Sequence, residues 1–205
     1  MPPEEIPLFE LPLVVLPTEL VPLHIFEERY KRMFEHCRST DSTLAILLRT
    51  DAGASAIGCA AEVTEVLEEF DDGRLNVGVT GLHRVRIVEQ RAGPDFPLAS
   101  VEPVAEAEEP DADAEPALAA FRRLLEAVGS DQVATPQTPS AYAIAARVEL
   151  PVDVKQSLLE SGSESARLEL IERALDELAE QAIRSRKLGE LASGNGHAGT
   201  EIQGD

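Results

Sequence analysis

Four prolines recur at five-residue spacing through the apolar opening of the chain, and they limit what this region can form. Residues 6–37 read IPLFELPLVVLPTELVPLHIFEERYKRMFEHC. A proline in a helix interior costs about 3 kcal/mol, whereas strand edges and turns tolerate it because they do not need its missing N–H. Residues 13–16 are therefore predicted to form a short buried strand, and residues 18–19 a turn.

The same opening run does not fit a membrane span or a secretion signal. A spanning helix needs about 20 uninterrupted apolar residues, and Glu10, Thr18 and Glu19 interrupt this run. A signal peptide carries basic residues before its apolar stretch, whereas Glu4 and Glu5 stand there. We therefore expect a soluble, cytoplasmic protein with no membrane partner.

The apolar period changes between residues 25 and 37. Apolar side chains recur there three or four positions apart, which predicts an amphipathic helix. The other face is charged, and the pairs Glu27–Lys31 and Glu28–Arg32 have the spacing of ion pairs one helical turn apart. The apolar stripe comprises Phe26, Tyr30, Met33, Phe34 and Cys37.

A strand-rich region follows this helix. Residues 43–48 (TLAILL) are typical of a buried strand, and residues 97–104 are a candidate for another. Between them, Asp-Asp-Gly at residues 71–73 predicts a hairpin turn, because glycine accepts a positive φ. Apolar residues alternate with polar ones in the flanking segments, as in half-buried antiparallel strands. Five or six strands with one early helix predict a small curled sheet or open barrel.

The net charge of −20 argues against nucleic acid as a partner. Nucleic-acid binding depends on Lys and Arg side chains that neutralise phosphates. Arg84 and Arg86 project from one strand face and are a candidate anion site. Local salt bridges are the favoured explanation for both arginines in so acidic a chain.

An acidic segment separates the strand-rich part from a helical part. Residues 102–116 hold seven acids, no base and three prolines, a composition typical of a solvated connector. Beyond it, apolar residues at helical spacing predict four helices. The expected division is a β-rich subdomain at residues 1–104, an acidic linker at 105–116, a helical subdomain at 117–192 and a flexible tail at 193–205.

Capping signals predict where several of these helices begin and end. Pro116 and Gly129 bracket the first helix in the usual start-and-stop arrangement. Asp153 and Gln156 have the spacing of a capping box at the start of the third helix. The fourth helix is predicted over residues 163–192.

No catalytic, cofactor-binding or metal-binding residues are predicted. The sequence contains no GxxxxGK[ST], HExxH or GxSxG motif. Cys37 and Cys59 lack metal-ligand spacing and are expected to be small buried apolar side chains. The enzymatic alternative is a small hydrolase whose site combines scattered carboxylates with a histidine such as His24.

Three stretches of this sequence resemble one known family. They are PLHIFEERY at residues 22–30, DDGRLNVGVTGLHRVRI at 71–87 and LPVDVKQSLLESGSESARLELI at 150–171. In this order they are similar to the Lon substrate-binding domain, the N-terminal domain of the ATP-dependent Lon protease, which is also found as a stand-alone protein. The similarity covers about residues 6–178. The sequence has Glu28 where the family usually has proline, and Val85 where an aromatic residue is common.

The resemblance implies an α+β fold, with a PUA-like β pseudo-barrel and one helix followed by a C-terminal helical bundle. It also implies recognition of unfolded or partner polypeptides, with proteolytic machinery as a further expected partner. In Lon the ATPase and the Ser-Lys peptidase lie downstream, and this chain is expected to lack both. PUA-like barrels can also bind RNA, but this alternative rests on fold analogy alone.

We therefore expect a non-catalytic module that binds exposed apolar polypeptide segments. Main-chain pairing at a sheet edge and a groove between the two subdomains are the two possible routes. The candidate surface is the first helix and its approach, where Glu27, Glu28, Arg29 and Lys31 are predicted to be exposed.

Overall fold

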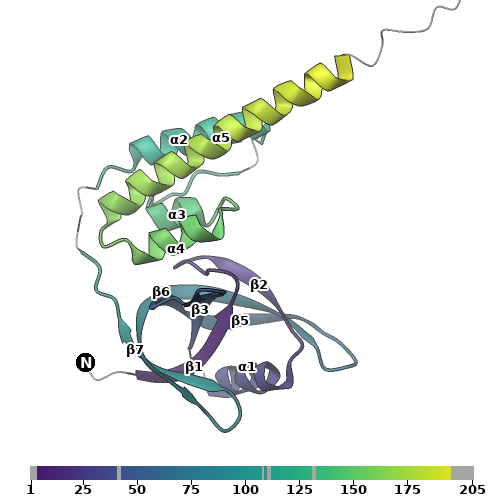
Figure 1. Ribbon diagram of the computed structural model, residues 1–205, viewed down its shortest axis with the longest axis vertical. Coiled ribbons are helices and arrows are strands. Elements are labelled where there is room, and N and C mark those ends of the chain that lie inside the picture. Colours follow the sequence, from purple (N-terminus) through teal and green to yellow (C-terminus); the bar gives the residue numbers. More distant parts are fainter. Residues whose placement is uncertain (1–3, 41–42, 108, 110–111, 131–132, 195–205) are drawn as a thin grey trace, which may run out of the picture.

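The computed structural model describes residues 4–40, 43–107, 109, 112–130 and 133–194, with side chains up to residue 188. The strands and helix α1 occupy the first half of the chain, and the helices of the second half lie over one end of the strand layer (Figure 1). The predicted α+β class is confirmed. The strands end at Pro103, and the helices of the second half begin at Glu115. Most of the tail predicted at 193–205 lies outside the described residues.

The strands curl into a barrel because β1 pairs on both of its sides. The strand order is β1-β7-β6-β5-β3-β4, and β2 pairs with β6. The first half of β1 runs antiparallel to β7, and its second half runs parallel to β3. The β1–β3 pairing therefore closes the order of strands into a ring. The described strands are β1 (Glu4–Leu11), β2 (Leu20–Ile25), β3 (Leu44–Thr50), β4 (Gly53–Ala54), β5 (Ile57–Glu69), β6 (Leu75–Ala92) and β7 (Pro97–Pro103).

Residues of β1 alternate between two hydrophobic clusters. Ile6 and Leu8 pack with Leu47 and Val85 inside the barrel. Phe9 belongs to the cluster that α1 (Glu28–Thr40) covers. Because successive side chains of a strand point to opposite faces, β1 joins the barrel interior to the layer beneath α1.

The strand predicted at residues 13–16 is wrong. Val14, Val15 and Leu16 are buried, but no strand forms there; β1 ends before them and β2 begins after them. Prolines on both sides remove N–H groups that a strand would need. The segment instead lies against β6, where Pro17 forms an isolated bridge with Gly81.

The predicted first helix is confirmed, but its start and its ion pairs are not. The helix begins at Glu28, so Phe26 lies before it and is 61% exposed instead of forming part of the apolar stripe. Glu28 pairs with Lys31 at 2.8 Å, and Arg32 lies 3.7 Å from Asp95. The helix therefore contributes Met33, Phe34 and Cys37 to the core.

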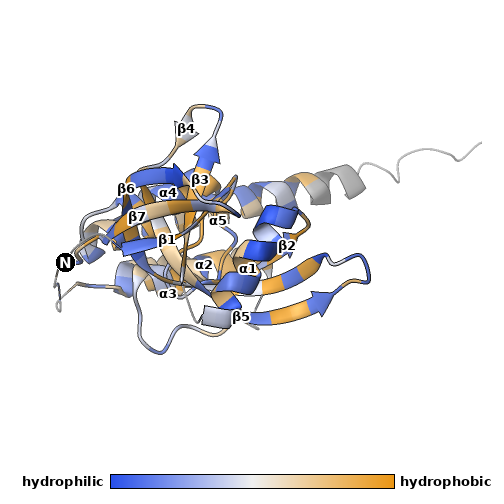
Figure 2. Cartoon of the chain, turned by 90° about the horizontal axis from the view of Figure 1, so that it is seen from below, coloured by the Kyte–Doolittle hydropathy of each residue, from blue (hydrophilic) through white to orange (hydrophobic). Residues whose placement is uncertain are grey.

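The hairpin at residues 71–73 is confirmed, with Gly73 at φ 76° between β5 and β6. Figure 2 shows this hairpin extending away from the barrel. The predicted buried state of both cysteines is also confirmed, and burial raises the pKa of Cys37 to about 11 and that of Cys59 to about 12. Neither thiol is therefore ionised near neutral pH.

In the described part of the chain, four helices follow the acidic segment, and α5 is the longest of them. Gly129 ends α2 in the left-handed conformation, as predicted. None of the described helices is both long and apolar enough to cross a bilayer. The helices are α2 (Glu115–Val128), α3 (Ala141–Ala145), α4 (Val152–Glu160) and α5 (Glu164–Gly194).

The predicted capping box of α4 is wrong, because no side chain caps this helix. Gln156 is buried and turns toward the barrel, where its Nε2 donates to the Ile57 carbonyl oxygen at 3.1 Å. The box could not form because Pro151, which has no N–H, occupies the N-cap; Gln156 also donates to Glu160 of the same helix at 2.7 Å.

Arg84 connects the barrel to the helices. It lies on β6 with only 2% of its surface exposed, and it donates to the carbonyl oxygens of Leu159 (2.9 Å) and Ser161 (2.6 Å). Its Nε also donates to Glu106 Oε1 at 2.6 Å, and Arg167 of α5 donates to the other oxygen of Glu106 at 2.8 Å. The expected salt bridge of Arg84 is therefore present, but it is a long-range contact, and the acidic segment is more than a solvated connector.

We expect Glu106→Gln to destabilise the protein, because the substitution leaves two buried arginines without their shared carboxylate. Hydrogen bonds to charged groups contribute about 1.5–3 kcal/mol. Glu106 is 47% exposed, so solvent screening places the expected loss near the lower end of that range. Urea unfolding measures the change. Glu102→Gln on the exposed side of β7 is the matched control, and equal stability of the two variants would contradict this role.

Gly81→Ala is expected to destabilise the barrel, because an added Cβ would lie 2.1 Å from the Leu16 carbonyl oxygen. Overpacking of this kind costs roughly 1–3 kcal/mol. At Gly162 an added Cβ meets nothing within 4 Å, so Gly162→Ala is the control. A thermal melt that shows the same midpoint for both variants would refute the close approach.

Candidate functional site

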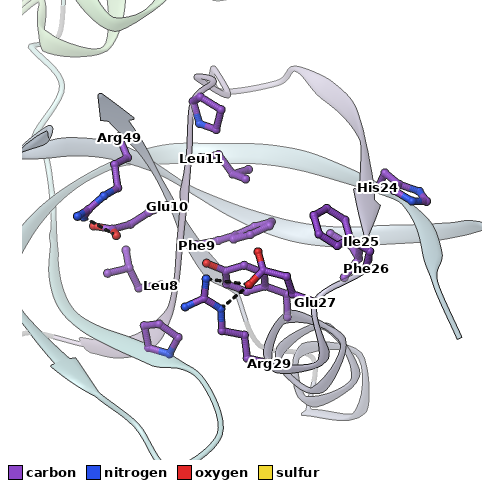
Figure 3. Close-up of a pocket in the computed structure, with 13 residues that line it drawn as sticks. Leu8, Phe9, Glu10, Leu11, His24, Ile25, Phe26, Glu27, Arg29 and Arg49 are labelled. Carbon is purple, nitrogen blue, oxygen red and sulfur yellow. Dashed lines mark hydrogen bonds and ion pairs between the residues drawn. The ribbon is translucent and has the colours of Figure 1, made fainter. Parts of the chain in front are cut away.

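A groove of about 630 Å³ opens between β1, β2 and the start of α1 (Figure 3). Strand β1 supplies one wall, the last residues of β2 supply the other, and the residues leading into α1 supply an end. The apolar residues of the groove include Leu8, Phe9, Leu11, Ile25, Phe26 and Tyr30.

Aromatic side chains form the base of the groove. The rings of Phe9 and Tyr30 lie 4.4 Å apart, and Phe9 meets Phe34 of α1 edge-on at 5.6 Å. Burial raises the pKa of Tyr30, so its hydroxyl stays neutral at physiological pH. The base is therefore an uncharged surface, suited to apolar side chains.

The charged groups around the groove pair with one another. Glu27 accepts from Arg29 at 2.9 Å, and Glu10 accepts from Arg49 at 2.7 Å. Arg29 also lies over the ring of Tyr30, 4.4 Å from its centroid. Each carboxylate thus has a guanidinium partner, and the four charges cancel within the groove.

The four residues predicted to bind a partner are divided by the structure. Glu27 and Arg29 line the groove, whereas Glu28 and Lys31 do not. The Lys31 side chain is only 17% exposed and lies toward the hairpin turn, where its Nζ is 3.5 Å from the Asp72 carbonyl oxygen. The Lys31 ammonium lowers the pKa of Glu28.

Sequence reasoning missed the residues that β1 and β3 bring to the groove. Phe9 and Glu10 precede the motif on which the prediction was based, and Arg49 lies 39 positions after Glu10. Only the parallel pairing of β1 with β3 places them together. The strand predicted in this region was 13–16, so no sequence signal identified β1 or its edge.

His24 belongs to the groove but lacks the partners of a catalytic base. Its Nδ1 lies 2.7 Å from Asn76 Oδ1, and Asn76 in turn donates to Glu68 at 2.9 Å. Among the described residues, no hydroxyl or thiol is hydrogen-bonded to the imidazole. The same residues contain no cluster of metal-ligating side chains.

The comparisons with known proteins agree on one family. The model of the ATP-dependent protease La (LON) substrate-binding domain matches residues 5–177. Lon protease 1 of Syntrophobacter fumaroxidans is 28% identical in an alignment 177 residues long, which covers 77% of this chain and 22% of that protein. The chain thus spans about a fifth of this relative's length.

Two solved structures have a similar fold. The Lon N-terminal domain protein from Xanthomonas campestris has a TM-score of 0.61 and 25% identity, covering 81% of this chain and 95% of that one. The N-terminal domain of the Mycobacterium avium complex Lon protease has a TM-score of 0.67 and 21% identity, covering 84% and 98%. With the family model matching most of its length, this chain belongs to the Lon substrate-binding domain family.

Proposed function

We propose that this protein binds apolar segments of unfolded polypeptides in the groove between β1 and β2 and performs no chemistry on them. The observation that carries the proposal is an aromatic, uncharged base surrounded by ion pairs that already satisfy one another. Such a surface favours apolar side chains over a charged ligand. Membership of a substrate-binding domain family supports a polypeptide as the ligand.

The proposed role is that of a recognition module without ATPase or peptidase parts. The absence of nucleotide-binding and hydrolase motifs from the sequence supports this role. Proteolytic machinery is the expected context, because the relative and the two solved structures are Lon proteases or their N-terminal domains. The PUA-like character of the barrel and the cytoplasmic location remain predictions.

The alternative of a small hydrolase has less support. The carboxylates in the groove, Glu10 and Glu27, are each held by an arginine. His24 is hydrogen-bonded to an asparagine and is not poised beside a nucleophile.

Phe26→Ala is expected to weaken the binding of an unfolded polypeptide about tenfold, since covering one large apolar side chain contributes about 1.5–3 kcal/mol. Phe26 is 61% exposed, so its removal should not disturb folding. Reduced and carbamidomethylated lysozyme is the probe, and fluorescence anisotropy measures its affinity.

The matched control is Leu188→Ala, because Leu188 is 68% exposed on α5, outside the groove. Its affinity for the same probe should equal that of the wild type. No binding by the wild type, or the same loss in both variants, would count against the groove as the binding site.

A further inference from the structure

The groove lies along a strand edge that no described strand covers. β7 pairs with residues 4–7 of β1 and begins at Pro97, which itself lines the groove. Pro97 has no N–H with which to extend this pairing. Residues 8–11 of β1 pair with β3 on one side, and their other side faces the groove.

The identity of the lining residues supports this geometry. Side chains alternate between the two faces of a strand, so a groove over one face meets every second residue, whereas a groove along the edge meets consecutive ones. Leu8, Phe9, Glu10 and Leu11 all line this groove. Figure 3 shows Phe9 and Glu10 on opposite sides of β1. The groove therefore gives access to the main chain of β1.

Glu10 leaves one hydrogen-bond acceptor unused at this edge. Its Oε2 accepts from Arg49, but its Oε1 is buried and has no partner among the described residues. A buried acceptor without a donor is costly. Because this oxygen has almost no exposed surface, an added segment would pair with the main chain of β1 and not with the Glu10 carboxylate.

Charge indicates which segments would approach this edge. The ion pairs of the groove are neutral overall, whereas the whole chain carries −20. A field of this sign attracts basic segments and repels acidic ones over roughly a Debye length, about 8–10 Å at moderate salt. The complementary ligand has an apolar centre for the groove and basic residues on its flanks.

We propose that the groove binds an extended apolar polypeptide segment with basic flanks, as an added strand along residues 8–11 of β1. This inference rests on the polypeptide-binding function proposed above and specifies its mode. The segment takes the position beside β1 that β7 leaves open before Pro97. Main-chain hydrogen bonds supply affinity independent of sequence, and the apolar base selects the side chains.

Backbone N-methylation of a synthetic peptide tests the strand addition. The probe has five alternating valine and leucine residues flanked by two lysines at each end. Two derivatives carry N-methyl groups on either the odd or the even central residues. Because alternate N–H groups of a strand point to opposite edges, one derivative should bind about tenfold or more weakly than the unmodified peptide, and the other within about threefold.

Each outcome of this test is decisive. Equal effects of the two derivatives would overturn strand addition while leaving polypeptide binding intact. No binding of the unmodified peptide, with lysozyme still bound, would overturn this mode alone. Failure of both probes would overturn the proposed function with it.

The charge of the flanks is tested with the same apolar centre between glutamates. At low salt the lysine-flanked peptide should bind at least about fivefold more tightly, and the difference should shrink at about 0.5 M NaCl, where the Debye length is only a few ångströms. Equal affinities at low salt would overturn the preference for basic flanks.

Discussion

The divided pairing of β1 is the constraint on which the rest of the structure depends. One half of this strand pairs with β7 and the other half with β3, so a single eight-residue segment closes the barrel. The change of partner also leaves one edge of its second half open. Closure of the barrel and the open edge along the groove thus both follow from the way β1 divides its pairing. Pro97 is the residue at which β7 and its pairing with β1 stop.

A second set of contacts joins the barrel to the helices. Arg84 and Arg167 are both buried, and both donate to Glu106 from the acidic segment. Buried arginines need such partners, because an unpaired charge away from water is strongly unfavourable. Lys155 of α4 also pairs with Glu19 near the start of β2. These contacts hold the helices over one end of the barrel and leave the groove, on the side of α1, uncovered.

Local sequence signals predicted an element correctly where its conformation depends on residues close by in the sequence. The glycine of the hairpin turn and the glycine after α2 both adopt positive φ, as their positions required. Helix signals failed where the helix begins at another residue than the pattern indicated, as at Pro151 before α4 and Glu28 at the start of α1. Gln156 donates to a barrel carbonyl rather than capping its own helix. Phe26 has helical spacing but precedes the helix. Two of the four predicted partner-binding residues line the groove, their role in binding stays a prediction, and the part of β1 was not foreseen.

The sequence by itself determined the division into a strand-rich half and a helical half, the hairpin, the amphipathic first helix and the family, because each depends on periodicity, turn chemistry or a contiguous motif. The tertiary structure alone decided which strand closes the barrel, which carboxylate joins two buried arginines and which edge is left open. These features depend on pairing between residues that lie tens of positions apart, as with Glu10 and Arg49. Strand register and the shape of a groove arise only when such distant segments pack, and no local pattern encodes them.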